Sequence, residues 1–179
     1  FGLTVTNFKG KELTLPYSSF EYKTEVPKAN GQFIFLCQKS FDVESVLEEL
    51  QEKGYEKLVP FQNGLQAGQV ILKKFGSNQV ARGIVPFNVL SKGKGIFHQG
   101  TEGDLHLEDC PVGVEAARLL AYAALPVKVK KDIERYQWGK LLMNLNNPIN
   151  ALSGLPLKEQ LAQRGYRVIL AASIAESLR

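Results

Sequence analysis

The stretch most informative about the fold is residues 33–64, which read FIFLCQKSFDVESVLEELQEKGYEKLVPFQNG. It begins with a wholly apolar run, residues 33–37, which is typical of a parallel strand covered on both faces. Residues 43–53 then place apolar side chains on one helical face, and Asp42 is positioned to cap that helix. A second apolar run, residues 58–61, completes an order of strand, helix and strand.

Turn signals flank these elements and a further helix follows them. Asn30-Gly31 precedes the first strand, and Gln62-Asn63-Gly64 leads into a helical stretch that ends at Gly76. Strands that alternate with helices at this spacing predict a parallel, doubly wound sheet with right-handed crossovers. We expect three more strand-like segments to extend the far edge of that sheet, namely residues 79–87, 94–99 and 104–108.

The two ends of the chain differ in character. Residues 3–6 and 12–15 alternate as strands do and predict an opening β-hairpin. From residue 112 onward the pattern is entirely helical, with helical segments at residues 114–125, 133–152 and 166–178. Residues 126–131 are charged and begin with proline, so we expect them to be the hinge between the two halves.

The composition narrows the class of protein. The chain has 179 residues, of which 44% are hydrophobic, which is enough to bury a full-sized core. It has no apolar run long enough to cross a membrane and no secretory signal at its start, so a soluble, cytoplasmic protein is expected. The net charge of +4 comes from scattered lysines, which favours an anionic small ligand over nucleic acid or a membrane surface.

Cysteine and histidine are too scarce for a metal or disulfide framework. The chain has two of each, so no metal site is predicted. We expect Cys37, inside an apolar run, to be a buried and inert thiol. His98 and His106 are expected to be structural.

One polar stripe carries the strongest chemical signal. On a helix, Lys140, Asn144 and Asn147 stand at positions i, i+4 and i+7 of a segment otherwise rich in Leu, Met and Ile. A buried ammonium is costly unless it meets an anion or several acceptors, which favours a polar cleft for a small carboxylate or carbonyl compound. The alternative is that Lys140 reaches solvent and the asparagines cap a helix broken at Pro148.

This stretch resembles the helix motif of the ketopantoate reductase family, Trp-x-Lys-Leu-x-x-Asn followed by an Asn-Pro step and Ala-Leu-x-Gly. The resemblance implies that Lys140 is the catalytic lysine, which protonates or polarises the keto oxygen as hydride arrives. It implies that Asn144 and Asn147 bind substrate. Without a gap, Pro148 falls where the family has its second asparagine, and Asn147 is its neighbour.

The first half resembles the nucleotide domain of the same family. The resemblance implies that Lys39 lies near the cofactor at the end of the first strand, and that Asn63-Gly64 forms the turn beside the nicotinamide. It implies that Val89 touches the cofactor through its backbone. Lys39 and Asn63-Gly64 both lie at the carboxyl ends of predicted strands, where ligands bind in open α/β sheets.

The resemblance implies an α/β fold: a Rossmann-like doubly wound sheet lacking its first βαβ part, followed by the start of an all-α domain. The expected domains are residues 1–131, for part of the dinucleotide-binding domain, and residues 132–179, for part of the helical substrate domain. With no Gly-x-Gly-x-x-Gly turn before Phe1, the chain alone is expected to bind NADPH weakly.

The implied activity is NADPH-dependent reduction of 2-dehydropantoate, or a similar small 2-keto acid, to the 2-hydroxy acid in the pantothenate and coenzyme A pathway. A homodimer is a candidate assembly. The alternatives are another hydroxyacid dehydrogenase of the same two-domain build and a non-catalytic binding protein that keeps the scaffold.

Overall fold

The computed structural model describes residues 2–28 and 33–179, so the Asn30-Gly31 dipeptide lies outside the described residues. The chain forms two compact units. The first comprises Phe1–Gln62 and Gln66–Ile133, and the second comprises Glu134–Arg179 together with the loop Asn63–Leu65. Within the described ranges, none of the helices has both the length and the apolar character needed to cross a bilayer.

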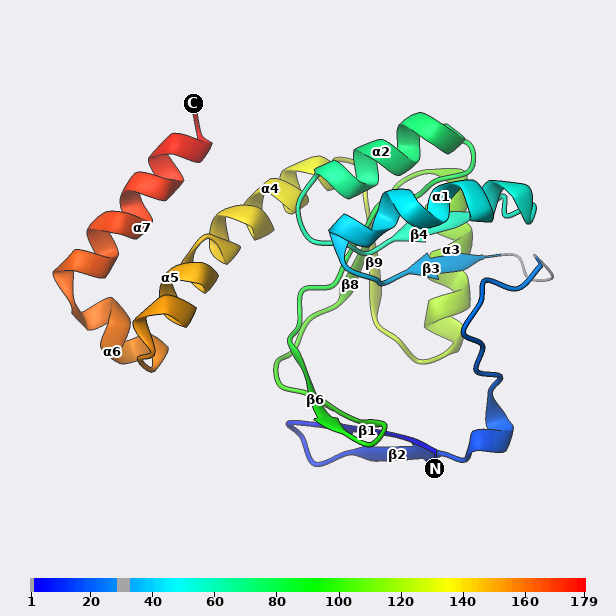
Figure 1. Ribbon diagram of the computed structural model, residues 1–179, viewed down its shortest axis with the longest axis horizontal. Coiled ribbons are helices and arrows are strands. Elements are labelled where there is room, and N and C mark those ends of the chain that lie inside the picture. Colours follow the sequence, from blue (N-terminus) through cyan, green and yellow to red (C-terminus); the bar gives the residue numbers. More distant parts are fainter. Residues whose placement is uncertain (1, 29–32) are drawn as a thin grey trace. The chain divides into compact units, whose positions relative to one another are not determined.

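The centre of the first unit is a parallel strand pair covered by helices on both faces (Figure 1). Strand β3 (Ile34–Leu36) pairs in parallel with β4 (Leu58–Pro60), and helices α1 (Val43–Glu52) and α2 (Gln66–Phe75) follow the two strands. Because side chains alternate along a strand, Leu58 packs into the core with α1 and α2, whereas Val59 packs into the core with α3 (Pro111–Tyr122). The expected strand, helix and strand order is confirmed.

Helix α1 starts differently from the expectation. Asp42 does occupy the N-cap position, but its side chain makes no capping hydrogen bond. Its backbone is helical because it ends the 3-10 turn Ser40–Asp42, whereas a capping residue needs an extended backbone. At the other end, Gly54 has φ +78°, and the helix stops there as predicted.

The parallel pair continues into a three-stranded sheet. Val80 bridges Leu58 in parallel, and the chain then enters the sheet with order β5-β8-β9. Its strands are β5 (Gly83–Ile84), β8 (Leu105–Glu108) and β9 (Val127–Lys130). Residues 104–108 do form a strand, but β8 lies in the middle of this three-stranded sheet and not at its edge, and residues 79–87 form only a short strand.

Residues 94–99, the second of the three strand-like segments, belong to a separate sheet, which corrects the expectation that they extend the far edge. That sheet has order β2-β1-β7-β6, with β1 (Leu3–Asn7), β2 (Glu12–Leu15), β6 (Val89–Gly93) and β7 (Ile96–Gln99). The β1–β2 hairpin was predicted, but β6 was missed because all five of its residues are exposed and show no alternation of burial. Gly95, at φ +75°, turns the chain into β7. A Cβ atom at position 95 would lie 2.7 Å from the Gly2 carbonyl oxygen, so this turn requires glycine.

The expected hinge and the expected all-helical second half are both wrong. Residues 126–131 contain β9, which pairs in parallel with β8, so the chain returns to the sheet after α3. The Val-Lys-Val-Lys pattern has the period of two that marks a strand, but its charge and the preceding proline resemble a linker. The first unit ends at Ile133, and the predicted first domain, which already contained α3, ends at residue 131.

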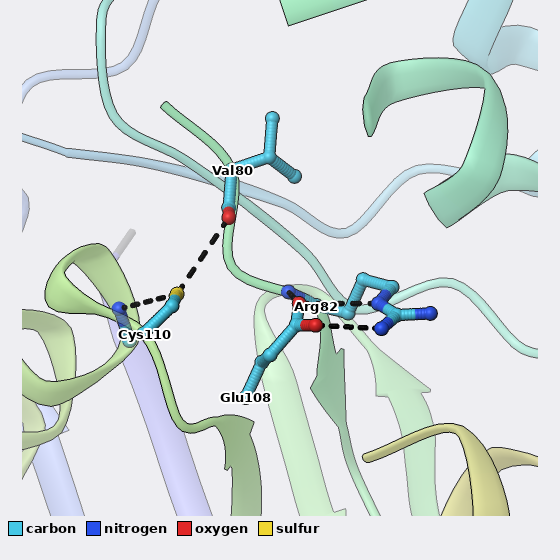
Figure 2. Close-up of polar contacts among 5 residues, drawn as sticks. Val80, Arg82, Glu108 and Cys110 are labelled. Atoms are coloured by element: carbon cyan, nitrogen blue, oxygen red, sulfur yellow. Dashed lines mark hydrogen bonds and ion pairs between the residues drawn. The ribbon is translucent and has the colours of Figure 1, made fainter. Parts of the chain in front are cut away.

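A bidentate ion pair joins Arg82, just before β5, to Glu108, the last residue of β8 (Figure 2). Arg82 donates from Nε to Glu108 Oε2 at 3.1 Å and from Nη2 to Oε1 at 2.6 Å, and its backbone N–H also donates to Oε2. Burial opposes ionisation of Glu108, but the hydrogen bonds and charge of Arg82 outweigh it and lower the pKa of Glu108. Beside the pair, Cys110 caps α3 by accepting from the Gly113 N–H at 3.4 Å.

The second unit contains four helices among its described residues: α4 (Ile133–Asn144), α5 (Asn146–Ser153), α6 (Leu157–Ala162) and α7 (Arg164–Ser177). Leu145, between α4 and α5, keeps helical backbone angles. The hydrogen-bond ladder breaks there because Pro148 has no N–H to donate to the Asn144 carbonyl, four residues earlier. The predicted break at Pro148 is thus an interruption within a nearly continuous helical path.

Burial in the second unit is lower than the apolar sequence suggested. Met143 is 80% exposed and Leu152 is 90% exposed, and Val168 and Ile169 on α7 are about half exposed. The expectation that the segment around Lys140 is buried on its apolar faces is therefore wrong for this chain. Four short helices have too little surface to cover one another on every side.

A buried amide network holds α5 against α6. Gln160 is fully buried, and it exchanges hydrogen bonds with Asn146 at 2.9 and 3.3 Å. Asn150 donates to the same Gln160 oxygen at 3.0 Å and to the Leu155 carbonyl at 3.0 Å. The network explains why α5, which buries no residue fully, keeps its position beside α6.

Gln160→Leu is expected to destabilise the helical unit by about 1–3 kcal/mol, because it leaves the amides of Asn146 and Asn150 without their buried partner. The measurement is urea denaturation of the full-length protein followed by helical circular dichroism. Gln163→Leu, at an exposed position beside the same helix, is the matched control. Equal stability of the two variants would contradict the role of the network.

Candidate functional site

The carboxyl ends of β3 and β4 bring two of the predicted site residues to one edge of the sheet. Leu36 and Pro60 are paired in the parallel register. Lys39 lies three residues beyond Leu36, and Asn63 lies three residues beyond Pro60. Lys39 is exposed and precedes the 3-10 turn that leads into α1, so its ammonium group is available at the edge where ligands of open α/β sheets bind.

The Asn63-Gly64 turn has the geometry that its sequence predicts. Gly64 has φ +81°, a left-handed backbone that favours glycine, and Asn63 is exposed. The loop Asn63–Leu65 belongs to the compact unit that contains α4. The turn and the Lys140 helix are therefore parts of one body.

Lys140 lies on α4 and is half-buried. Loss of solvent around its ammonium group lowers its pKa below the usual value for lysine. A lysine whose pKa is lowered by desolvation is a better proton donor near neutral pH than a solvated one.

The four asparagines near Lys140 divide into two pairs. Asn146 and Asn150 belong to the buried network around Gln160. Asn144 and Asn147 take no part in that network, and Asn147 Nδ2 donates to Asn144 Oδ1 at 3.4 Å. Asn144 is the last residue of α4, one turn after Lys140, so the ammonium and this amide pair are neighbours along one side of the helix.

A cavity of about 310 Å³ opens where α1 and α2 begin, which is also the end of the sheet at which β3 and β4 finish. Its lining is mixed polar and apolar and consists of Ser40, Val43, Glu44, Gln66, Ala67 and Val70. Among the described residues of this lining, Glu44 alone is charged.

The structure corrects the prediction for Cys37 and places Val89 in another sheet. Cys37 is exposed and not buried, because β3 ends at Leu36 and the thiol lies just beyond the strand. Val89 is the first residue of β6, in the sheet that contains the hairpin, and 54% of its surface is exposed. Val89 therefore lies in a different sheet from the strands that precede Lys39 and Asn63.

Comparison with known proteins identifies the family. The sequence pattern described as ketopantoate reductase PanE/ApbA matches residues 1–111, which is more than half of the chain. The chain belongs to the ketopantoate reductase family. No curated protein matches it.

Solved structures of ketopantoate reductases share the fold. A 2-dehydropantoate 2-reductase from Geobacter metallireducens GS-15 aligns with a TM-score of 0.79 at 22% identity, over 98% of this chain and 60% of that one. A ketopantoate reductase from Staphylococcus aureus, described as dimeric, aligns with a TM-score of 0.75 at 18% identity, over 100% of this chain and 60% of that one. The chain thus spans about three fifths of the length of these proteins.

The same fold occurs with a different substrate. D-mandelate dehydrogenase, solved with NADH and anilino(oxo)acetate, aligns with a TM-score of 0.74 at 19% identity, over 94% of this chain and 56% of that one. The Rossmann-like α/β class predicted from the sequence is confirmed, with part of an all-helical domain after it.

The sequence did not predict a role for Gln62, which follows β4 at the edge of the sheet where the strands end. Gln62 was treated as part of a turn, yet its side chain reaches across to the chain leaving β3. A glutamine before Asn-Gly carries no distinct signal, because a surface turn tolerates any polar residue there.

Proposed function

We propose that the full-length protein reduces a small 2-keto acid to the 2-hydroxy acid with a reduced nicotinamide cofactor, NADPH, and that 2-dehydropantoate is the substrate. The observation that carries the proposal is the half-buried ammonium of Lys140, whose pKa is lowered by desolvation, next to the Asn144 and Asn147 amides. Membership of the ketopantoate reductase family supports the reaction class.

The proposed role of Lys140 follows from the charge that develops during reduction. NADPH, when bound, supplies the hydride that reaches the keto carbon. Negative charge then builds on the keto oxygen, and an adjacent ammonium stabilises it and gives it a proton. Partial desolvation strengthens both effects, because a charge interacts more strongly when less water surrounds it.

The asparagine pair is proposed to orient the substrate. An amide offers both N–H donors and a carbonyl acceptor, which suits the carboxylate and hydroxyl groups of a small hydroxy or keto acid. Because Asn146 and Asn150 are committed to Gln160, Asn144 and Asn147 are the two amides of this segment proposed to bind substrate.

The residues at the sheet edge fit a nicotinamide nucleotide. Lys39 supplies a positive charge for a phosphate at the end of β3, and the left-handed turn at Gly64 lets a ligand approach the backbone closely. Asn63 and Gly64 are proposed to lie beside the nicotinamide, and the backbone of Val89 is proposed to contact the cofactor. A homodimer is also proposed, as described for the Staphylococcus aureus relative.

The second candidate is a hydroxyacid dehydrogenase for another 2-keto acid. The likeness to D-mandelate dehydrogenase supports it, because the same fold there accompanies an aryl substrate and NADH. A non-catalytic scaffold is the remaining alternative.

The deciding experiment measures the loss of reduced-nicotinamide absorbance by the full-length protein with 2-dehydropantoate and phenylglyoxylate, each with NADPH and NADH. The proposal expects the highest kcat/KM with 2-dehydropantoate and NADPH. A preference for phenylglyoxylate would favour the second candidate. No oxidation with either acid would contradict both enzyme proposals.

A further inference from the structure

The side chain of Gln62 joins the ends of the two parallel strands. Its Nε2 donates to the Leu36 carbonyl at 3.1 Å, to the Gln38 carbonyl at 3.3 Å and to Gln38 Oε1 at 3.3 Å. Leu36 is the last residue of β3, and Gln38 immediately precedes Lys39. The amide nitrogen therefore ties down the segment that carries Lys39.

These contacts determine which way the amide points. Three oxygen atoms surround one end of the side chain, and only an NH₂ group can donate to them. The opposite end must then be the carbonyl oxygen, Oε1. A flipped amide would set Oε1 against the Leu36 and Gln38 carbonyls and lose these hydrogen bonds.

The oxygen of this amide is buried and has no hydrogen-bond partner in the described part of the chain. Buried polar atoms in folded proteins are nearly always paired, so this oxygen is a suitable acceptor for a donor on a bound ligand. Gln62 directly precedes the Asn63–Leu65 loop, which shares a compact unit with Lys140. Because Asn63 and Gly64 are proposed to lie beside the nicotinamide, a ligand group that meets the adjacent Gln62 would belong to that ring.

We propose that Gln62 Oε1 accepts a hydrogen bond from the carboxamide N–H of the nicotinamide ring, while Gln62 Nε2 holds the Lys39 segment in place. The inference rests on the proposed function. It makes Gln62 a positioning residue that fixes the rotation of the ring. A carboxamide is the appropriate class of donor, because it is attached to the ring carbon next to the one that gives up hydride and its NH₂ group donates hydrogen bonds.

The test compares two cofactors that differ in one group. NADPH carries the carboxamide, and its 3-acetylpyridine analogue replaces the NH₂ with a methyl group and so cannot donate. Dissociation constants are measured by fluorescence titration for the full-length protein, for Gln62→Met and for Gln69→Met. Methionine matches glutamine in length without its polar atoms, and Gln69 is an exposed glutamine on α2.

The wild-type protein and Gln69→Met are expected to bind NADPH about three- to tenfold more tightly than the analogue. This difference in affinity is the usual contribution of one neutral hydrogen bond. In Gln62→Met this preference is expected to disappear. If Gln62→Met still binds NADPH more tightly than the analogue, the inference is overturned. It is also overturned if the wild-type protein binds the two cofactors equally, and that result does not depend on whether a variant folds.

The thermal midpoint of each protein without cofactor separates the two roles of the side chain. A purely structural Gln62 would lower the midpoint in Gln62→Met and leave the preference for NADPH unchanged, which contradicts the proposal. Failure of the wild-type protein to bind either cofactor would instead count against the proposed function itself.

Discussion

Lys140→Ala is expected to lower kcat for keto-acid reduction by about 10²–10⁴-fold, the usual contribution of a positioned acid or charge. The fold is expected to remain, because Lys140 is only half-buried and alanine favours a helix. Steady-state kinetics of the full-length protein with 2-dehydropantoate and NADPH measure the effect, and circular dichroism checks the fold.

Lys158→Ala, at an exposed position on α6, is the control and is expected to leave kcat unchanged. The pH dependence adds a second readout. Because reduction needs the ammonium form, kcat is expected to fall as pH rises through the lowered pKa of Lys140, and Lys140→Ala is expected to lose this limb. Turnover close to wild type in Lys140→Ala would reject the catalytic role.

Arg82→Met is expected to destabilise the first unit by about 2–4 kcal/mol, because it leaves the Glu108 carboxylate without its charged partner in a largely buried site. The Arg82 and Glu108 side chains are only 13% and 20% exposed, and three hydrogen bonds to the carboxylate are lost or weakened. Urea denaturation of the full-length protein measures the loss.

The pH dependence of that loss has a definite sign. In the wild-type protein the pKa of Glu108 is lowered, so the ion pair stabilises the fold above the unfolded pKa and this stability is lost as pH falls through the folded pKa. In Arg82→Met the unpaired carboxyl protonates more easily, so the difference between the two proteins is expected to shrink on acidification. A difference that stays constant between neutral and acidic pH would contradict this account.

Lys128→Met provides the comparison for Arg82→Met. It breaks the Lys128–Asp104 ion pair, in which the lysine side chain is 60% exposed. Exposed pairs contribute little because water screens them, so its denaturation midpoint is expected to stay close to that of the wild type. A loss as large as that of Arg82→Met would show that burial does not explain the difference.

Local periodicity predicted the centre of the fold well. The strand, helix and strand of residues 33–61 show clear apolar runs and one amphipathic face, and the structure has these elements at nearly the same residues. Strand β9 was misread because its alternating lysines resemble a linker, and β6 was missed because its side chains are exposed. Their pairing depends on partners distant in the sequence, which periodicity does not report.

Some features of the candidate site could likewise be predicted from the sequence, and others could not. The ends of parallel strands share an edge, so the proximity of the Lys39 and Asn63 segments could be expected from the order of elements alone. The sequence alone could not predict that the four asparagines divide into a structural pair and a second pair. That division depends on hydrogen bonds to Gln160, which lies ten or more residues away. The same holds for Gln62, whose partner segment lies 24 to 26 residues earlier.

The most direct test of the central claim is a crystal structure of the full-length protein with NADP⁺ and the 2-hydroxy acid product. The account predicts that Lys140 Nζ lies within hydrogen-bond distance, about 2.6–3.2 Å, of the oxygen on the second carbon. It would be contradicted by a complex in which another group meets that oxygen and the Lys140 amine points into solvent.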